Sequence, residues 1–142
     1  SSFPFEGSHY SGKPDYSKFI GYLMRNLVEI RESFLKETPN MRLGHLASDL
    51  ARIASFIEME MEAEAIKAVM EEGAFFSEWT AREVDLEIQM ILADIQSYLA
   101  QKKSEWNILS AQSSWRQDVV YQTRNWSQEL LRKAGFIEDE RH

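Results

Sequence analysis

The sequence predicts an all-α protein, an up-down-up-down four-helix bundle that follows an irregular aromatic N-terminal arm. Three observations favour this fold class. Apolar residues recur every three or four positions over most of the chain, the segments between these stretches are short, and 142 residues suit one domain with a sizeable core. No apolar run approaches the length of about 18 residues that a membrane span needs, so we expect no membrane partner.

Residues 1–14 are predicted to form the arm, because glycines, prolines and serines interrupt any periodic pattern there. Phe3, Phe5 and Tyr10 are unusual in a disordered tail, which favours an arm that lies against the domain or a partner. The chain starts at Ser1 without a methionine and shows no signal-peptide pattern. We therefore expect that something before this residue was removed.

The first helix is predicted over residues 15–37, beginning at the capping residue Asp15. Its apolar stripe comprises Tyr16, Ile20, Leu23, Leu27, Ile30 and Phe34. The second helix is predicted over residues 39–72, because Thr38 can cap its start and Gly73 suits the position after its end. Its stripe begins with Leu43, Leu46, Leu50, Ile53 and Ile57.

The third helix is predicted over residues 78–102. Thr80 and Glu83 form a capping-box pattern near its start, and Ser77 is the competing cap. The positive charge of Lys102 suits the C-terminal end of a helix. Its apolar stripe comprises Val84, Ile88, Ile91, Ile95 and Tyr98.

The fourth helix is predicted over residues 104–134 and is followed by Gly135, so that the bundle spans residues 15–137 before a charged tail at 138–142. No glycine or proline separates the third and fourth helices, and one continuous rod is the alternative. The apolar stripe changes phase near residues 101–104, which favours a turn there.

Composition and charge limit the function. The net charge is −7 and the calculated isoelectric point is about 5.0, so we expect no nucleic-acid partner, because sequence-independent binding depends on neutralising phosphates. The chain has no cysteine, which excludes disulfides, thiol catalysis and thiolate metal sites. The same absence fits a cytoplasmic location. We also expect no bound cofactor.

His45 is the candidate for chemistry on the second helix. It flanks the core stripe beside Leu46, and Asp49 lies one turn later, where its carboxylate could orient the imidazole. An accessible histidine on a long bundle helix is typical of a phosphotransfer site, where the imidazole is the nucleophile. Such domains generally carry a lysine three residues after the histidine, and Ser48 stands there. A histidine phosphotransfer-type signalling domain is therefore an alternative function.

The second helix also carries an acidic wall, whose carboxylates could hold a divalent metal ion. The wall comprises Glu58, Glu60, Glu62, Glu64, Glu71 and Glu72. The metal candidates are Glu58, Glu62 and, on the third helix, Asp94. No Glu-x-x-His motif occurs, which excludes a ferritin-like di-iron centre.

The stretch Leu92–Leu99 resembles the second metal-binding motif of the MazG-type nucleotide pyrophosphohydrolases. Asp94 matches the aspartate of that motif, but Ile91 stands where the family has glutamate. In residues 48–52, which would replace the first motif, only Asp49 is acidic. The resemblance implies a degenerate site for a divalent metal and a nucleotide as a further alternative.

The leading interpretation is a small non-enzymatic regulatory or adaptor protein that acts through helix-face contacts with a protein partner or as a homo-oligomer. No Gly-x-Ser-x-Gly motif and no glycine-rich phosphate loop is present. The fourth helix combines residue types that are enriched at interaction hot spots. The predicted interaction residues are Trp115, Trp126, Arg116 and Arg124.

Overall fold

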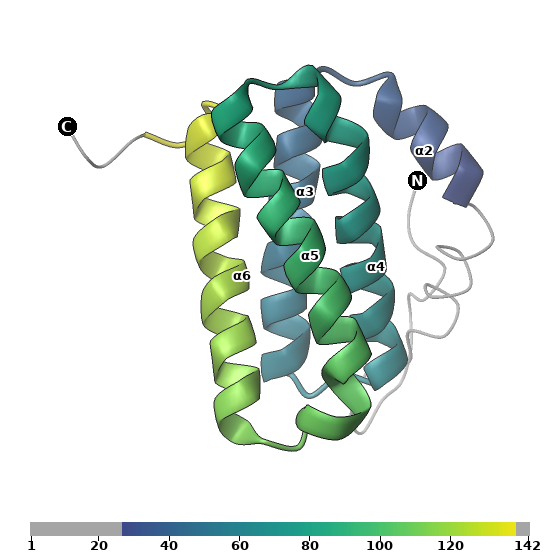
Figure 1. The fold of residues 1–142 in the computed structure, drawn as a ribbon, viewed down its shortest axis with the longest axis vertical. Helices are drawn as coiled ribbons and strands as arrows, with labels where there is room; N and C mark the ends of the chain where they lie inside the picture. Colours follow the sequence, from purple (N-terminus) through teal and green to yellow (C-terminus); the bar gives the residue numbers. More distant parts are fainter. Residues whose placement is uncertain (1–26, 139–142) are drawn as a thin grey trace, which may run out of the picture.

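The structure, a computed structural model, describes residues 27–138, and every regular element in this range is helical (Figure 1). The prediction of an all-α protein is confirmed for this part of the chain. The predicted arm and residues 15–26 of the predicted first helix lie outside it, as do tail residues 139–142. The elements are α2 (Leu27–Leu35), α3 (Pro39–Glu58), α4 (Ala63–Thr80), the 3₁₀ helix η1 (Ala81–Glu83), α5 (Leu86–Leu109) and α6 (Ser113–Lys133).

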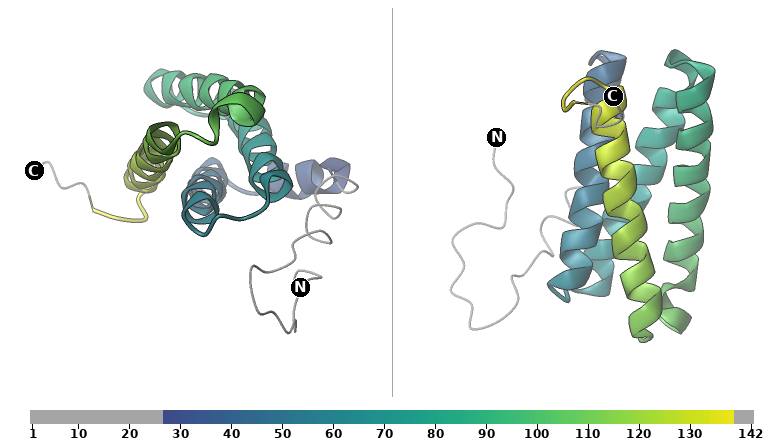
Figure 2. Two further views of the ribbon diagram at one scale, coloured as in Figure 1. Left: turned by 90° about the horizontal axis from the view of Figure 1, so that it is seen from below. Right: turned by 90° about the vertical axis from the view of Figure 1, so that its left-hand side faces the viewer.

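The four long helices α3 to α6 lie side by side, and each runs opposite to the one before it (Figures 1 and 2). α3 packs along α4 and α6, and α4 packs along α5, whereas the backbones of α5 and α6 stay farther apart. α2 lies outside this group, beside the end of α4 (Figure 1). None of the helices in the described range has both the length and the apolar character that crossing a membrane requires.

The core fills the space between the four long helices. Burying one aliphatic side chain of this size stabilises a fold by about 1.5–3 kcal/mol, so the inner stripes hold the helices together. The largest side chains that are fully buried are Leu43, Leu46, Leu50, Ile53, Ile66, Val69, Met70, Leu92, Ile95, Leu99, Val119 and Leu130.

The predicted helix over residues 39–72 is two helices in the structure, because the chain turns back after α3. Glu60 adopts a left-handed φ of 53°. The Glu60 N–H donates to the Ile57 carbonyl at 3.1 Å, and the Met61 N–H donates to the Phe56 carbonyl at 3.0 Å. This pair of bonds is a Schellman motif, which usually has glycine at the left-handed position. The apolar stripe continues beyond the break because α4 returns along the same core.

Gly73 lies inside α4 and does not end a helix. A Cβ atom at this position would lie 2.9 Å from a methyl group of Leu99, so the glycine lets α5 approach closely. The predicted caps of the third helix are also wrong. Ser77 and Thr80 are buried in α4, and the Asp85 carboxylate instead accepts from the Ile88 N–H at 3.0 Å to start α5.

The predicted turn at residues 101–104 lies within α5, and the chain turns only after Leu109. The change of phase in the apolar stripe does not mark a turn. Trp106 continues the buried stripe of α5, and Lys102 interrupts the apolar pattern because it occupies an inward position. The Lys102 ammonium lies 5.0 Å from the centre of the Tyr98 ring and 5.9 Å from that of Trp115. A lysine that covers aromatic rings with its stem interrupts the apolar pattern without ending the helix.

A second Schellman motif ends α6. Gly135 has a φ of 84°, its N–H donates to the Arg132 carbonyl at 3.1 Å, and the Phe136 N–H donates to the Leu131 carbonyl at 2.9 Å. Phe136 then folds back onto α3. A Cβ atom on Gly44 would lie 2.8 Å from the Phe136 ring, so the absence of a side chain makes room for this contact.

Candidate functional site

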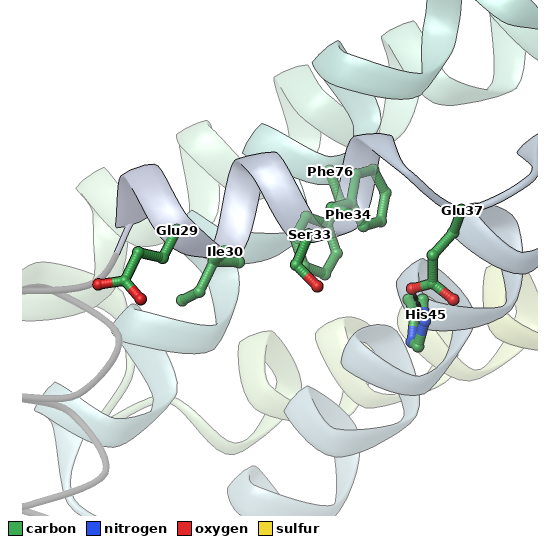
Figure 3. A pocket seen from close by; sticks show the side chains of 7 residues that line it. All are labelled: Glu29, Ile30, Ser33, Phe34, Glu37, His45 and Phe76. Carbon is green, nitrogen blue, oxygen red and sulfur yellow. Dashed lines mark ion pairs between the residues drawn. The ribbon is translucent and has the colours of Figure 1, made fainter.

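His45 lies at one end of a hollow of about 300 Å³ between α2, α3 and α4 (Figure 3). Its Nε2 atom is 2.5 Å from Glu37 Oε1, and 44% of the histidine side chain is exposed. Glu29 lies at the opposite end of the hollow, with Phe34 and Phe76 between the two carboxylates (Figure 3). The hollow thus combines an aromatic floor with acidic ends, a chemistry that suits a cationic group better than an anionic one.

Phe34 anchors α2 against the rest of the fold. Its ring stacks on Phe76 with centroids 4.0 Å apart and planes inclined by 11°, and it also contacts Trp79 at 5.9 Å. Only 3% of its surface is exposed. The ring of His45 lies 6.3 Å from the same phenylalanine. The histidine therefore borders a packed aromatic cluster, which favours a role in packing over a role in chemistry.

The predicted pairing of His45 with Asp49 does not occur. Asp49 is 2% exposed, and its carboxylate accepts from Arg52 at 3.2 Å. Burial raises the pKa of Asp49 well above its usual range, and the negative charge of Glu72 on α4 raises it further. Glu37, from the link between α2 and α3, takes the place that the sequence assigned to Asp49.

This geometry gives little support to phosphotransfer. The Glu37 carboxylate lies directly at Nε2 of His45, where an incoming phosphoryl group would meet a like charge. Ser48 and Asp49 supply no positive charge that would attract a phosphate. The contacts favour a histidine that links the α2–α3 connection to α3.

Arg42 is the best-connected residue near this hollow, and sequence reasoning missed it. Its guanidinium donates to the Leu35 carbonyl at 2.8 Å, to the Glu37 carbonyl at 3.1 Å and to Glu83 Oε2 at 2.6 Å. It is 4% exposed and lies 5.9 Å from the centre of the Phe34 ring. One side chain thus caps the end of α2 and ties it to η1. An arginine in the first turn of a helix, where its charge is unfavourable, is the only signal the sequence offers.

Trp115 and Trp126, which the structure places on α6, face α5. Trp115 is 8% exposed, donates from its indole N–H to Glu105 at 3.1 Å, and packs edge-on against Trp106 at 5.5 Å. Trp126 is half-buried and packs edge-on against Tyr98 at 5.0 Å. These rings fill the space where the α5 and α6 backbones stand apart. Trp115 is therefore a core residue, not part of an exposed interaction surface.

The two predicted interaction arginines are also engaged within the chain. Arg116 donates to the Ser110 carbonyl and so closes the turn between α5 and α6. Arg124 forms a bidentate pair with Glu58 at 2.8 and 2.5 Å, which joins α6 to the end of α3. The pair borders a hollow of about 450 Å³ that Val120 and Tyr121 of α6 also line.

The acidic wall does not assemble as predicted. Glu58 is held by Arg124, which lowers the pKa of its carboxyl below the usual range. Glu62 precedes α4 and Asp94 lies on the outer side of α5, and both are exposed. Within residues 27–138, no three carboxylate or histidine side chains come together in a way that could hold a metal ion. Of the acidic positions compared with the MazG-type motifs, Asp49 is buried in α3 and Asp94 is exposed on α5.

A different surface remains without a partner in the described part of the chain. α5 exposes three large apolar side chains on its outer side: Leu86 at 70%, Met90 at 62% and Ile108 at 79%. Figure 2 shows α5 at the edge of the helix group, with its outer side turned away from the other helices. Sequence reasoning missed this surface because Leu86 and Met90 had been assigned to the predicted third helix and Ile108 to the predicted fourth.

Over residues 27–138, the fold and its contacts define an all-helical structure, whose candidate sites are a hollow beside His45, a hollow beside the Arg124–Glu58 pair and an apolar face of α5. No protein-family model, curated protein or solved structure matches the chain. Each of the first two sites contains an ion pair within the chain, Glu37 with His45 in the first and Glu58 with Arg124 in the second. The three apolar side chains of the α5 face, by contrast, are exposed in the described part of the chain.

Proposed function

We propose that this protein is a small non-enzymatic regulatory or adaptor protein that acts through helix-face contacts and associates with itself. The outer face of α5 carries the proposal. Leu86, Met90 and Ile108 are each more than three-fifths exposed and share one side of a single helix. Single exposed apolar residues are ordinary, but Leu86 and Met90 lie one turn apart, and neighbouring exposed apolar side chains favour an interaction surface.

The proposed scaffold is an up-down-up-down four-helix bundle of α3 to α6, with α2 attached at one end. The packing of α3 on α4 and α6, and of α4 on α5, supports this assignment. A net charge of −7 supports a protein partner over a nucleic acid. The absence of cysteine supports a reducing compartment such as the cytoplasm.

Sedimentation equilibrium of the full chain from micromolar to millimolar concentration tests the proposal. We expect a monomer–dimer equilibrium that Met90→Glu shifts at least tenfold toward monomer, because a charge would be buried in the contact. The matched control is Tyr121→Glu, which places the same charge on a residue that is 68% exposed on α6. A wild-type chain that stays monomeric at millimolar concentration would refute self-association.

A further inference from the structure

We infer that the hollow between α2, α3 and α4 binds a linear polyamine, a ligand whose positively charged amino groups are joined by short apolar chains. The inference goes beyond self-association and does not depend on it. It rests on the order of chemical groups along the hollow: a carboxylate stands at each end, and apolar side chains lie between them (Figure 3). A polyamine presents the complementary order, with a charge at each end and methylene groups between.

Negative charge lies at both ends of the hollow. Glu29, in the first turn of α2, is exposed. Glu37, after the end of α2, has a side chain that is 33% exposed, and its Oε1 atom faces His45. A carboxylate has two oxygen atoms that accept hydrogen bonds, so the second oxygen of Glu37 can accept one from an amine. Each end therefore offers an acceptor to one ammonium group.

The lining of the hollow has little positive charge of its own. Its described residues include no lysine or arginine, and His45 is the one among them that can carry a positive charge. Arg31 of α2 lies instead 5.6 Å from the centre of the Trp79 ring, and Arg42 of α3 donates to Glu83 and to two carbonyls. The chain as a whole carries a net charge of −7, which attracts cations. Local and overall charge therefore both favour a cationic ligand.

The middle of the hollow distinguishes a polyamine from a metal ion. Ile30 is half-buried there, and Phe34 and Phe76 line the hollow beside it. Methylene groups that leave water against such side chains favour binding. Ser33 is exposed and lies between the two ends, where its hydroxyl can accept a hydrogen bond from a central amine (Figure 3). A bare metal ion would make no apolar contact with this lining.

The length of the hollow selects a long polyamine over a short one. Glu29 and Glu37 lie eight positions apart, and the N–H group of Glu37 still donates to the Phe34 carbonyl at 3.1 Å, so the chain remains coiled up to this residue. At the rise of an α-helix, eight positions correspond to about 12 Å. Spermidine can extend over this span, whereas the shorter putrescine reaches only one end at a time. The volume of about 300 Å³ is at the lower limit of small-molecule sites, roughly 300–1,000 Å³, which suits a slender chain.

Titration of the isotope-labelled full chain with spermidine, followed by backbone amide NMR at constant ionic strength, tests the inference. We expect saturable shifts that centre on the hollow, at Ser33 and His45, and not on the outer side of α5. Spermidine should bind at least about fivefold more tightly than putrescine or butylamine, because only spermidine engages both ends and the middle. Equal affinity for the three amines would overturn the two-ended arrangement.

Paired variants separate the hollow from the acidic surface in general. The double variant Glu29→Gln, Glu37→Gln should weaken spermidine binding at least about fivefold, because both ion pairs with the ligand are lost. The matched control, Glu32→Gln with Glu64→Gln, removes the same charge from two exposed positions outside the hollow and should change the affinity less than about twofold. Equal weakening by the two double variants would show non-specific attraction and overturn the site.

Two checks keep the result specific to the ligand. Glu37→Gln also loses its pair with His45, so Glu29→Gln alone provides the second measurement, and it should weaken binding while the ligand-free spectrum stays unchanged. The absence of saturable shifts at millimolar spermidine would overturn the inference. A chain that binds spermidine in the hollow but stays monomeric in sedimentation would overturn self-association and support this site, so the two proposals fail separately.

Discussion

Arg42 provides the most direct test of how α2 is held to the rest of the protein. Arg42→Ala removes two hydrogen bonds from a charged donor to the carbonyls of Leu35 and Glu37. Each such bond contributes about 1.5–3 kcal/mol. The ion pair with Glu83 adds less than about 1 kcal/mol, because that glutamate is 49% exposed and screened by water.

These contributions sum to an expected loss of about 3–7 kcal/mol in the free energy of unfolding. A domain of this size usually has 5–15 kcal/mol in total, so the effect is large. With a urea dependence of about 1.5 kcal/mol per molar, the unfolding midpoint should fall by about 2–5 M. Tryptophan fluorescence and circular dichroism at 25 °C would follow the transition.

Two matched variants make the measurement specific. Arg82→Ala removes the same charge from an exposed position on the neighbouring η1, and it should change the unfolding free energy by less than about 0.5 kcal/mol. Arg42→Lys keeps the charge near Glu83 but loses the fork that reaches two carbonyls, so it should retain at most half of the stabilisation. An Arg42→Ala variant as stable as wild type would refute the capping argument.

Three further predictions follow from single side chains. Glu60→Gly should raise the unfolding free energy by about 0.5–1 kcal/mol in urea titration, because glycine adopts the left-handed φ without strain, whereas Glu62→Gly should lower it. Trp115→Phe should cost about 1–3 kcal/mol through the lost bond to Glu105, with an unchanged dimer constant in sedimentation. Asp49→Asn should stabilise the protein at neutral pH. The raised pKa of Asp49 favours the folded state below about pH 4, and this gain is lost as pH rises through the folded pKa. Urea midpoints of wild type and variant should therefore converge at low pH, and equal midpoints at pH 7 would refute the account.

The sequence predicts the all-α class because periodic apolar stripes depend only on local spacing. It misplaces the boundaries where tertiary contacts replace the usual signals. Glu60 ends α3 in a conformation that normally indicates glycine, while Gly73 serves close packing inside α4. Lys102 occupies an inward position because aromatic rings lie beside its stem. None of these roles follows from apolar spacing: Glu60 takes a backbone conformation that usually belongs to glycine, and the contacts of Gly73 with Leu99 and of Lys102 with Trp115 join different helices.

The candidate site was harder to predict for the same reason. His45 was correctly singled out as accessible, with 44% of its side chain exposed. Its partner was assigned by helical spacing to Asp49, but the structure supplies Glu37 from outside the helix. Arg124 and Glu58 were placed in separate hypotheses, although they are 66 positions apart and form one ion pair. Pairs that join distant elements carry no periodic signal.

α5 shows why one helix can mislead a pattern analysis and still carry a function. It has an inner stripe with Leu99 at its centre and an outer stripe with Met90, and periodicity alone cannot tell which one is buried. Substitutions in the two stripes should therefore have different effects: a change in the inner stripe should lower folding stability, and a change in the outer stripe should weaken association. Leu99→Ala should cost about 2–5 kcal/mol of folding free energy. Met90→Glu should change it by less than about 0.5 kcal/mol while weakening the dimer. If Met90→Glu destabilised the monomer as strongly as Leu99→Ala, the outer stripe would be packed within the chain, and α5 would have no free face to offer a second copy.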